Sequence, residues 1–140
     1  MIERYSRKEL KDIWSEENKY KIWLEVEIAA AEAMEKFKMI PKGVSSIVKK
    51  KGKIKVKRIH DIEAKVKHDV IAFLTSITEQ AGIKARYLHQ GMTSSDVLDT
   101  SFNIQLMQSG KIILKDIDKI LIVLKRQAKK YKMTPCIGRS

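Results

Sequence analysis

The side chains best suited to chemistry lie in the segment "GMTSSDVLDT", residues 91–100. Thr93, Ser94 and Ser95 place three hydroxyls in a row, directly before a long stretch with helical apolar periodicity. The first backbone N–H groups of a helix have no intrahelical acceptor, and the helix dipole adds partial positive charge there. Hydroxyl donors at such a position would surround an anion, and a carboxylate would fit.

Ordinary helix capping is the simpler interpretation of the same segment. Serine and threonine are preferred N-cap residues, and Asp96 would lie in the first turn, where negative charge is favourable. On spacing alone this interpretation is the default at any helix start. One cap needs one hydroxyl, however, so the segment supplies more donors than capping requires.

Two histidines are candidates for chemistry. His68 is flanked by Lys67 and Asp69 and, within a helix, would lie about 200° from the apolar position Val70. A lone histidine on a polar helix face is usually only solvated. His89 is the stronger candidate because we expect it in a loop, and loops held by rigid helices often carry function.

Metal and cofactor chemistry find little support. The histidines, including His60, which we expect at the surface, lack the spacing of a metal site such as HExxH. No glycine-rich phosphate loop, dinucleotide fingerprint or GxSxG elbow is present in the sequence. We therefore expect neither a metal nor a cofactor.

Composition indicates a folded protein that favours anionic partners. The 140 residues are 44% hydrophobic, and 29 Lys+Arg against 17 Asp+Glu give a net charge of +12. The densest basic run, "KKKGKIKVKR" at 49–58, has no aromatic residue to stack on bases. We interpret it as a solvated connection, with a non-catalytic basic module that binds nucleic acid as the alternative.

The sequence also predicts a cytoplasmic protein without a membrane partner. Cys136 is the only cysteine, so an intrachain disulfide is impossible and a reducing compartment is the simpler assumption. The N-terminal "MIERYSRKEL" carries charge where a signal peptide needs an apolar core, and no apolar run approaches the length of a membrane span.

The periodicity throughout is helical, which predicts an all-α fold. Ser6 followed by Glu9 has the spacing of a capping box, and Ser15 is expected to cap the next helix. Gly110 would weaken or kink a helix, so we expect a domain boundary or a helix break near 109–111, with one domain at 1–110 and another at 111–140. The expected helices are 7–14, 16–38, 56–81 and 95–131.

The apolar residues of the second segment have nothing left in this sequence on which to pack. They recur with helical spacing, as in the start of a helical bundle. We therefore expect the chain to be the front part of a larger protein. These residues are Ile113, Ile117, Ile120, Leu121 and Leu124.

Four sequence blocks resemble, in order and spacing, the N-terminal portion of bacterial-type adenylosuccinate lyases, which belong to the fumarase and aspartase superfamily. The similarity covers essentially the whole chain, and its third block is the most specific. It implies a helical N-terminal domain plus the first long helix of a central helical bundle. The blocks are "MIERYS" at 1–6, "HDVIAF" at 68–73, "HQGMTSSDVLDT" at 89–100 and "GRS" at 138–140.

The resemblance implies a cofactor-free β-elimination. The family releases fumarate from adenylosuccinate, giving AMP, and from succinyl-aminoimidazole-carboxamide ribonucleotide in purine synthesis. A base takes a weakly acidic proton beside a carboxylate, so preformed donors to that carboxylate would lower the barrier. The implied partners are a nucleotide substrate and further copies of the chain, as a homotetramer.

By this resemblance, Thr93 and Ser94 hold the succinyl or fumarate carboxylate. Arg4 and Tyr5 resemble the pair that clamps the nucleotide phosphate. A sister lyase of the argininosuccinate type is the nearest alternative, and its substrate, which has no phosphate, would have little use for Arg4 and Tyr5.

His68 and His89 resemble the paired histidines of the family, which bind substrate and support the proton donor. Lys67 and Asp69 adjoin His68 in the same binding strip. The family commonly has arginine where Lys67 stands, so a bidentate contact is replaced by a single-point one.

The proton-transfer groups of the family lie beyond this sequence. The family motif G-R-[ST]-H would place the general acid directly after Ser140, and the serine base follows much further along. The 140 residues therefore carry the electrostatic half of the expected site, and on their own they are expected to be inactive.

Overall fold

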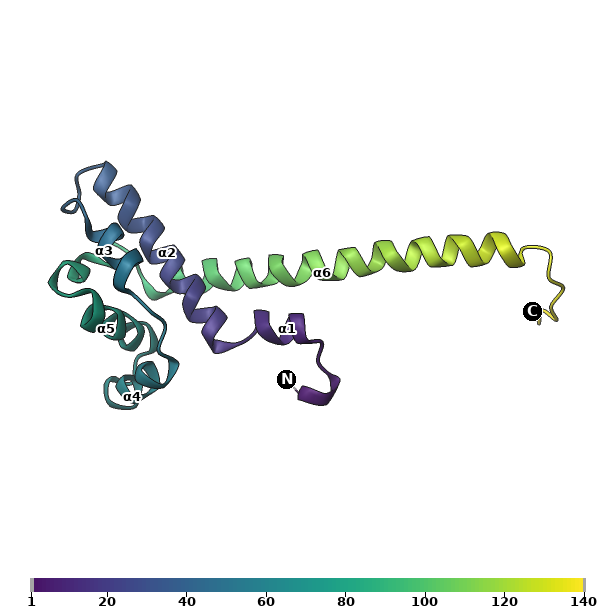
Figure 1. Cartoon of the computed structure of the whole chain (residues 1–140), viewed down its shortest axis with the longest axis horizontal. Coiled ribbons are helices and arrows are strands. Elements are labelled where there is room, and N and C mark those ends of the chain that lie inside the picture. The colour runs from purple at the N-terminus through teal and green to yellow at the C-terminus, as the bar shows by residue number, and fades with distance from the viewer. Residues whose placement is uncertain (1, 140) are drawn as a thin grey trace. The chain divides into compact units, whose positions relative to one another are not determined.

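The computed structural model describes residues 2–139 and shows only helices within them, which confirms the predicted all-α fold (Figure 1). No helix of these residues is long and apolar enough to cross a membrane. The helices in chain order are η1 Glu3–Tyr5, α1 Lys8–Ile13, α2 Glu16–Lys36, α3 Val44–Lys51, α4 Val56–Val66, α5 Asp69–Ala81, η2 Ile83–Tyr87 and α6 Ser94–Tyr131.

The chain divides into two compact units, Met1–Leu106 and Met107–Ser140. The first unit contains α1 to α5 and the beginning of α6, and the second contains the remainder of α6. The division into domains at 1–110 and 111–140 stays a prediction, because a compact unit need not be a domain that folds by itself.

The predicted helix break at Gly110 was wrong. Residues 94–131 form one continuous helix, and Gly110 lies within it. A glycine inside a helix costs only about 1 kcal/mol relative to alanine. That cost does not interrupt a cooperative helix of 38 residues, whose hydrogen bonds continue on both sides of the glycine.

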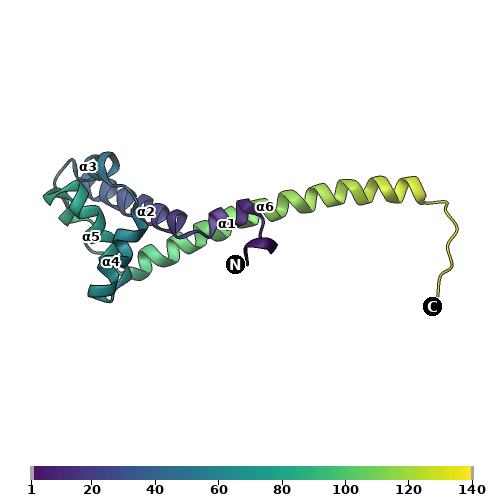
Figure 2. The ribbon, with the colours of Figure 1, turned by 60° about the horizontal axis from the view of Figure 1, so that its bottom comes forward.

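An aromatic cluster joins α2 to α5 in the core of the first unit. The rings of Tyr20 and Phe73 stack with centroids 6.0 Å apart, and Trp23 meets both edge-on at 5.2 and 5.5 Å. All three side chains are buried. Each such pair contributes on the order of 1 kcal/mol beyond the burial of its area. Figure 2 shows α3, α4 and α5 gathered beside α2.

The first turns of α1 and α2 differ from each other in how they are capped. Ser15 accepts a hydrogen bond from the Asn18 N–H at 3.2 Å, so the predicted cap of α2 is confirmed. The predicted capping box of Ser6 was wrong. Arg7 is the N-cap of α1 without a side-chain cap, and the Ser6 hydroxyl donates to the Ile2 carbonyl oxygen at 2.7 Å.

The single helix predicted at 56–81 is two helices, α4 and α5. Lys67 has a left-handed backbone with φ 56°, and His68 is extended with φ −150°. The break has neither glycine nor proline, and the apolar periodicity continues across it, so no local signal predicts it. The break places His68 at the start of α5.

The basic run at 49–58 was predicted to be a connection, and this prediction is only partly correct. Its first lysines belong to the end of helix α3. Three lysines occupy the last turn of α3, where positive charge complements the helix dipole. Gly52 is the C-cap of α3, and glycine fits this position because a Cβ there would lie 2.7 Å from the Val48 carbonyl oxygen. The beginning of α3 is held by Glu35 of α2, whose carboxylate accepts the backbone N–H of Gly43 at 3.1 Å and of Ser45 at 2.6 Å.

Substituting Glu35→Gln should destabilise the protein at neutral pH but not in acid. The backbone N–H donors of Ser45 and Gly43 lower the pKa of Glu35, so its contribution is present above the ordinary carboxyl pKa and is lost as pH falls through the lowered value. We expect a loss of about 1 kcal/mol in the free energy of unfolding at pH ~7 that shrinks toward zero at pH ~3. Urea unfolding at the two pH values measures it.

The matched control is Glu32→Gln, on the same helix. Glu32 makes an exposed ion pair with Lys49 at 3.7 Å, which contributes less than about 0.5 kcal/mol. A loss for Glu35→Gln that is the same at both pH values would contradict the capping role of the carboxylate.

Candidate functional site

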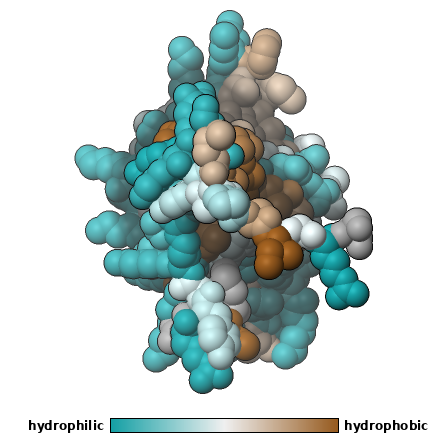
Figure 3. All heavy atoms as spheres, turned by 90° about the vertical axis from the view of Figure 1, so that its right-hand side faces the viewer, coloured by the Kyte–Doolittle hydropathy of each residue, from teal (hydrophilic) through white to brown (hydrophobic). Residues whose placement is uncertain are grey.

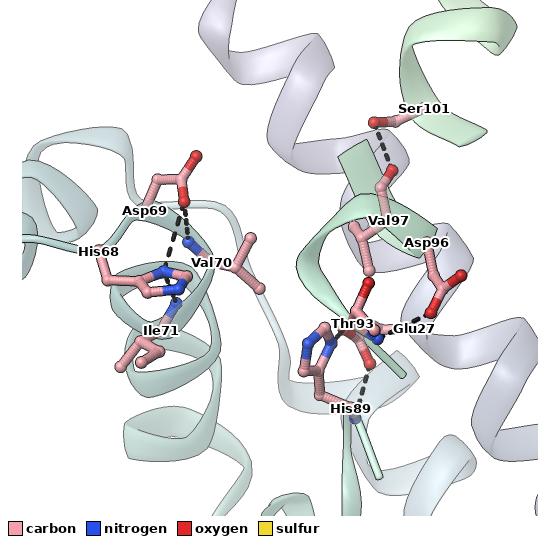
Figure 4. A network of polar contacts seen from close by, with 10 residues as sticks. All are labelled: Glu27, His68, Asp69, Val70, Ile71, His89, Thr93, Asp96, Val97 and Ser101. Carbon is pink, nitrogen blue, oxygen red and sulfur yellow. Dashed lines mark hydrogen bonds and ion pairs between the residues drawn. The ribbon is translucent and has the colours of Figure 1, made fainter. Parts of the chain in front are cut away.

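The hydroxyl-rich segment lies at the beginning of α6, as predicted. Asp96 caps this helix start: its Oδ2 accepts the Thr93 backbone N–H at 2.7 Å, and its own N–H donates to the Thr93 carbonyl oxygen at 3.1 Å (Figure 4). Asp96 is the third residue of α6, and its carboxylate bonds to the backbone N–H of Thr93, the residue before the helix. This contact is one half of a capping box. The capping interpretation therefore holds for Asp96 and not for the hydroxyls.

The side-chain hydroxyls of Thr93, Ser94 and Ser95 do not cap α6 and can therefore bind other groups. Thr93 and Ser95 are exposed and Ser94 is partly exposed. Within residues 2–139, none of these hydroxyls makes a hydrogen bond. The negative charge of Asp96 opposes a second anion nearby, but its carboxylate engages only the Thr93 N–H. The Asp96 N–H donates to Thr93, whereas the N–H groups of Ser94 and Ser95 lack intrahelical acceptors. The helix start can therefore still receive a carboxylate.

His89 precedes this segment and is fixed by a buried carboxylate. Glu27 Oε2 accepts the His89 backbone N–H at 2.8 Å, and Glu27 Oε1 lies 2.7 Å from the ring Nδ1. The backbone of His89 is left-handed, with φ 62°, which costs a non-glycine residue on the order of 1 kcal/mol. The two contacts from one carboxylate offset that strain and hold the residue in place.

Glu27 is a functional candidate that the sequence analysis missed. Its side chain is fully buried on α2, and burial raises the pKa of Glu27, while its contacts with His89 oppose that rise. A signal was present in the sequence. Glu27 stands four residues after Trp23 and four before Ala31, and both of these are buried, so helical spacing alone puts the carboxylate on the buried face.

His68 lies at the beginning of α5 and not within a helix, so its predicted position on a helix face was wrong. Its Nδ1 accepts the Ile71 N–H at 3.5 Å, the limit of hydrogen-bonding distance, and lies 3.4 Å from Asp69 Oδ1. Asp69 in turn accepts the Val70 N–H at 2.7 Å. The ring is 43% exposed, and Lys67 beside it is exposed too, so this group is accessible to a ligand.

The predicted site residues fall into separate groups. Figure 4 shows His89 with Thr93 and Glu27, and His68 with Asp69 at the beginning of α5. Arg4 and Tyr5 belong to η1, which lies beside α1 and away from the beginning of α5 in Figures 1 and 2. The Arg4 guanidinium stacks 4.7 Å from the centre of the exposed Tyr5 ring. One chain does not bring η1 to the two histidines.

Comparison with known proteins shows the class of this chain. A family model described as Lyase matches residues 3–140, so the chain belongs to this lyase family. The chain is 46% identical to the adenylosuccinate lyase of Thermotoga maritima and 44% identical to that of Synechocystis sp.. Both alignments cover 140 residues, all of this chain and 32% of the relative. The predicted resemblance is confirmed.

Two further comparisons agree with this result. The adenylosuccinate lyase of Aquifex aeolicus is 46% identical over 143 residues, which cover all of this chain and 33% of that protein. The structure resembles a fumarate lyase from Mesorhizobium sp. BNC1 with a TM-score of 0.86 and 22% identity, over 94% of this chain and 32% of that one. That structural likeness supports the fold. The chain spans about a third of the length of these proteins.

Two substitutions at His68 test whether its side chain caps α5. His68→Ala removes the weak cap of α5 and should lower the free energy of unfolding by about 0.5 kcal/mol. His68→Asn should preserve or raise it, because asparagine is among the best N-cap residues. Thermal unfolding of the two variants tests this. Equal destabilisation by both substitutions would contradict the capping role.

Proposed function

We propose that the chain is the N-terminal part of an adenylosuccinate lyase, which releases fumarate from adenylosuccinate to give AMP. The same enzyme would act on succinyl-aminoimidazole-carboxamide ribonucleotide in purine synthesis. The observation that carries this proposal is the identity of 44–46% over the whole chain with three adenylosuccinate lyases. A cytoplasmic location fits the single cysteine, Cys136, whose thiol is free and exposed.

The beginning of α6 would bind the carboxylate of the leaving fumarate. β-Elimination removes a proton from carbon beside a carboxylate, so negative charge builds up on that carboxylate in the transition state. Thr93 and Ser94 would donate hydrogen bonds to it, aided by the positive end of the helix dipole. The exposure of these hydroxyls and their freedom from other partners among the described residues support this role.

The two histidines would bind substrate from different elements and support the proton donor. His68 offers an exposed ring at the beginning of α5, with Lys67 and Asp69 as polar neighbours. His89 offers a ring that is held by Glu27 and is 20% exposed. The general acid itself would follow Ser140, which lies outside the described residues.

Arg4 and Tyr5 would bind the nucleotide phosphate, because an exposed guanidinium matches a phosphate in charge and geometry. Since η1 lies away from the histidines within one chain, we propose that the complete site uses residues of neighbouring copies in a homotetramer. The 140 residues alone should release no measurable fumarate. Measurable release by the purified 140-residue chain would contradict this assignment of the missing groups.

Substituting the two hydroxyl residues tests the carboxylate site directly. In the full-length protein, Thr93→Ala and Ser94→Ala should each lower kcat on the order of 100-fold, because each removes a donor to the developing charge. Fumarate release from adenylosuccinate, followed by ultraviolet absorbance, measures this. Thr100→Ala, an exposed hydroxyl on the same helix, is the matched control and should keep its activity.

Unchanged activity in both hydroxyl variants would contradict the carboxylate site. Fumarate release from argininosuccinate in place of adenylosuccinate would instead favour a sister lyase.

The second unit provides a surface for self-association. Its part of α6 exposes a series of large apolar side chains that one copy of the chain leaves uncovered. Figure 3 shows apolar side chains exposed among hydrophilic ones on this face of the chain. Exposed apolar surface of this extent is typical of an interface. The residues are Ile113, Leu114, Ile117, Ile120, Leu121, Ile122, Val123 and Leu124.

Charged substitutions on this surface should therefore prevent assembly. We expect Ile117→Lys with Leu124→Lys to shift the full-length protein from tetramer toward monomer in sedimentation velocity, because burying two lysine charges is costly. Lys125→Gln, a neighbouring exposed position, should leave the assembly unchanged. A tetramer that survives the double substitution would place the interface elsewhere.

A further inference from the structure

Glu27 has no part in the proposed elimination, yet its carboxylate is the most buried charged group near the site. Its side chain is fully buried, whereas the His89 ring that it contacts is 20% exposed. The contact joins α2 to the loop before α6 across 62 residues of sequence. A carboxylate in the middle of a buried helix face is costly to keep unless it is well paired. Its two contacts with His89 provide that pairing.

An ionised Glu27 determines which ring nitrogen of His89 carries the proton. An ionised carboxylate has only acceptors. Oε2 accepts the backbone N–H of His89, which can only donate, and Oε1 lies 2.7 Å from Nδ1. With Glu27 ionised, the proton of this contact must therefore lie on the ring as Nδ1–H. In the neutral imidazole this leaves Nε2 as the acceptor, and in the imidazolium it leaves Nε2–H as a single outward donor.

We propose that Glu27 is a positioning residue for His89: it selects the Nδ1–H form of the ring and presents Nε2 as the nitrogen that meets the substrate. This inference rests on the proposed lyase function and adds to it a residue that does not touch the substrate. Glu27 acts through two bonds of different kinds. The bond to the backbone N–H holds the left-handed residue in place, and the bond to Nδ1 sets the ring.

The substitution Glu27→Gln makes a sharp test because an amide has one acceptor oxygen where the carboxylate has two. The backbone N–H of His89 cannot change its role, so the amide oxygen should take that bond. The amide NH₂ then faces Nδ1 and must donate to it. The ring should respond by moving its proton to Nε2, so the variant keeps the position of the ring but inverts the tautomer.

The ¹⁵N shifts of the ring measure this directly in the full-length protein labelled at histidine. At pH ~9, above the ordinary titration range of histidine, the wild-type His89 ring should show Nδ1–H. The Glu27→Gln variant should show Nε2–H, with His60 and His68 unchanged. Single His→Gln variants assign the three signals. A wild-type ring that carries its proton on Nε2 would overturn the inference without any variant.

Activity provides the second readout. Glu27→Gln should lower kcat/KM for adenylosuccinate at least about tenfold, because a ring in the wrong tautomer presents the wrong hydrogen-bonding group. The matched control is Glu25→Gln, the same chemical change at an exposed position on the same helix, which should alter neither tautomer nor kcat/KM. Circular dichroism checks that both variants keep the helical fold.

The outcomes separate the two proposals. An active wild type, with Glu27→Gln equal to it in both tautomer and kcat/KM, would overturn the positioning role and leave the lyase function standing. A wild type that shows Nδ1–H and loses it in Glu27→Gln, but releases no fumarate, would overturn the lyase function. In that case the selection of the ring form by Glu27 would stand.

Discussion

The contact between Glu27 and His89 is the constraint on which the candidate site depends. One carboxylate on α2 binds both the backbone N–H and the ring of a residue 62 positions later, just before α6 begins. Burial makes an unpaired carboxylate costly, so we expect Glu27 to stay paired with His89 whenever the first unit is folded. Because His89 has a left-handed backbone, the same contact also fixes the direction in which the chain enters the segment that carries Thr93.

Two helix beginnings, those of α5 and α6, carry the polar groups of the site. At each of them an aspartate accepts a backbone N–H: Asp69 that of Val70, and Asp96 that of Thr93. The aspartates stabilise the helix ends and leave His68 and the Thr93 hydroxyl accessible. Helix beginnings would suit the proposed carboxylate ligand, because unpaired N–H groups and the helix dipole supply positive potential that does not depend on ionisable groups.

The two units of the chain satisfy their apolar residues differently. In the first unit the aromatic cluster of Tyr20, Trp23 and Phe73 is buried within the chain itself. In the second unit apolar residues such as Ile117 and Leu121 remain open to solvent. In the proposed assembly, neighbouring copies of the chain would cover this surface.

The sequence established the helical class, the Ser15 cap, the start of α6 to within one residue and the family, because each of these depends on spacing along the chain or on a local motif. It did not reveal the break at Lys67, which lacks glycine and proline and yet adopts a left-handed backbone between two packed helices. The pairing of Glu27 with His89 and the separation of η1 from the histidines became visible in the folded chain alone. Contacts between residues far apart in sequence arise from packing, and local periodicity carries no information about which buried carboxylate meets which ring.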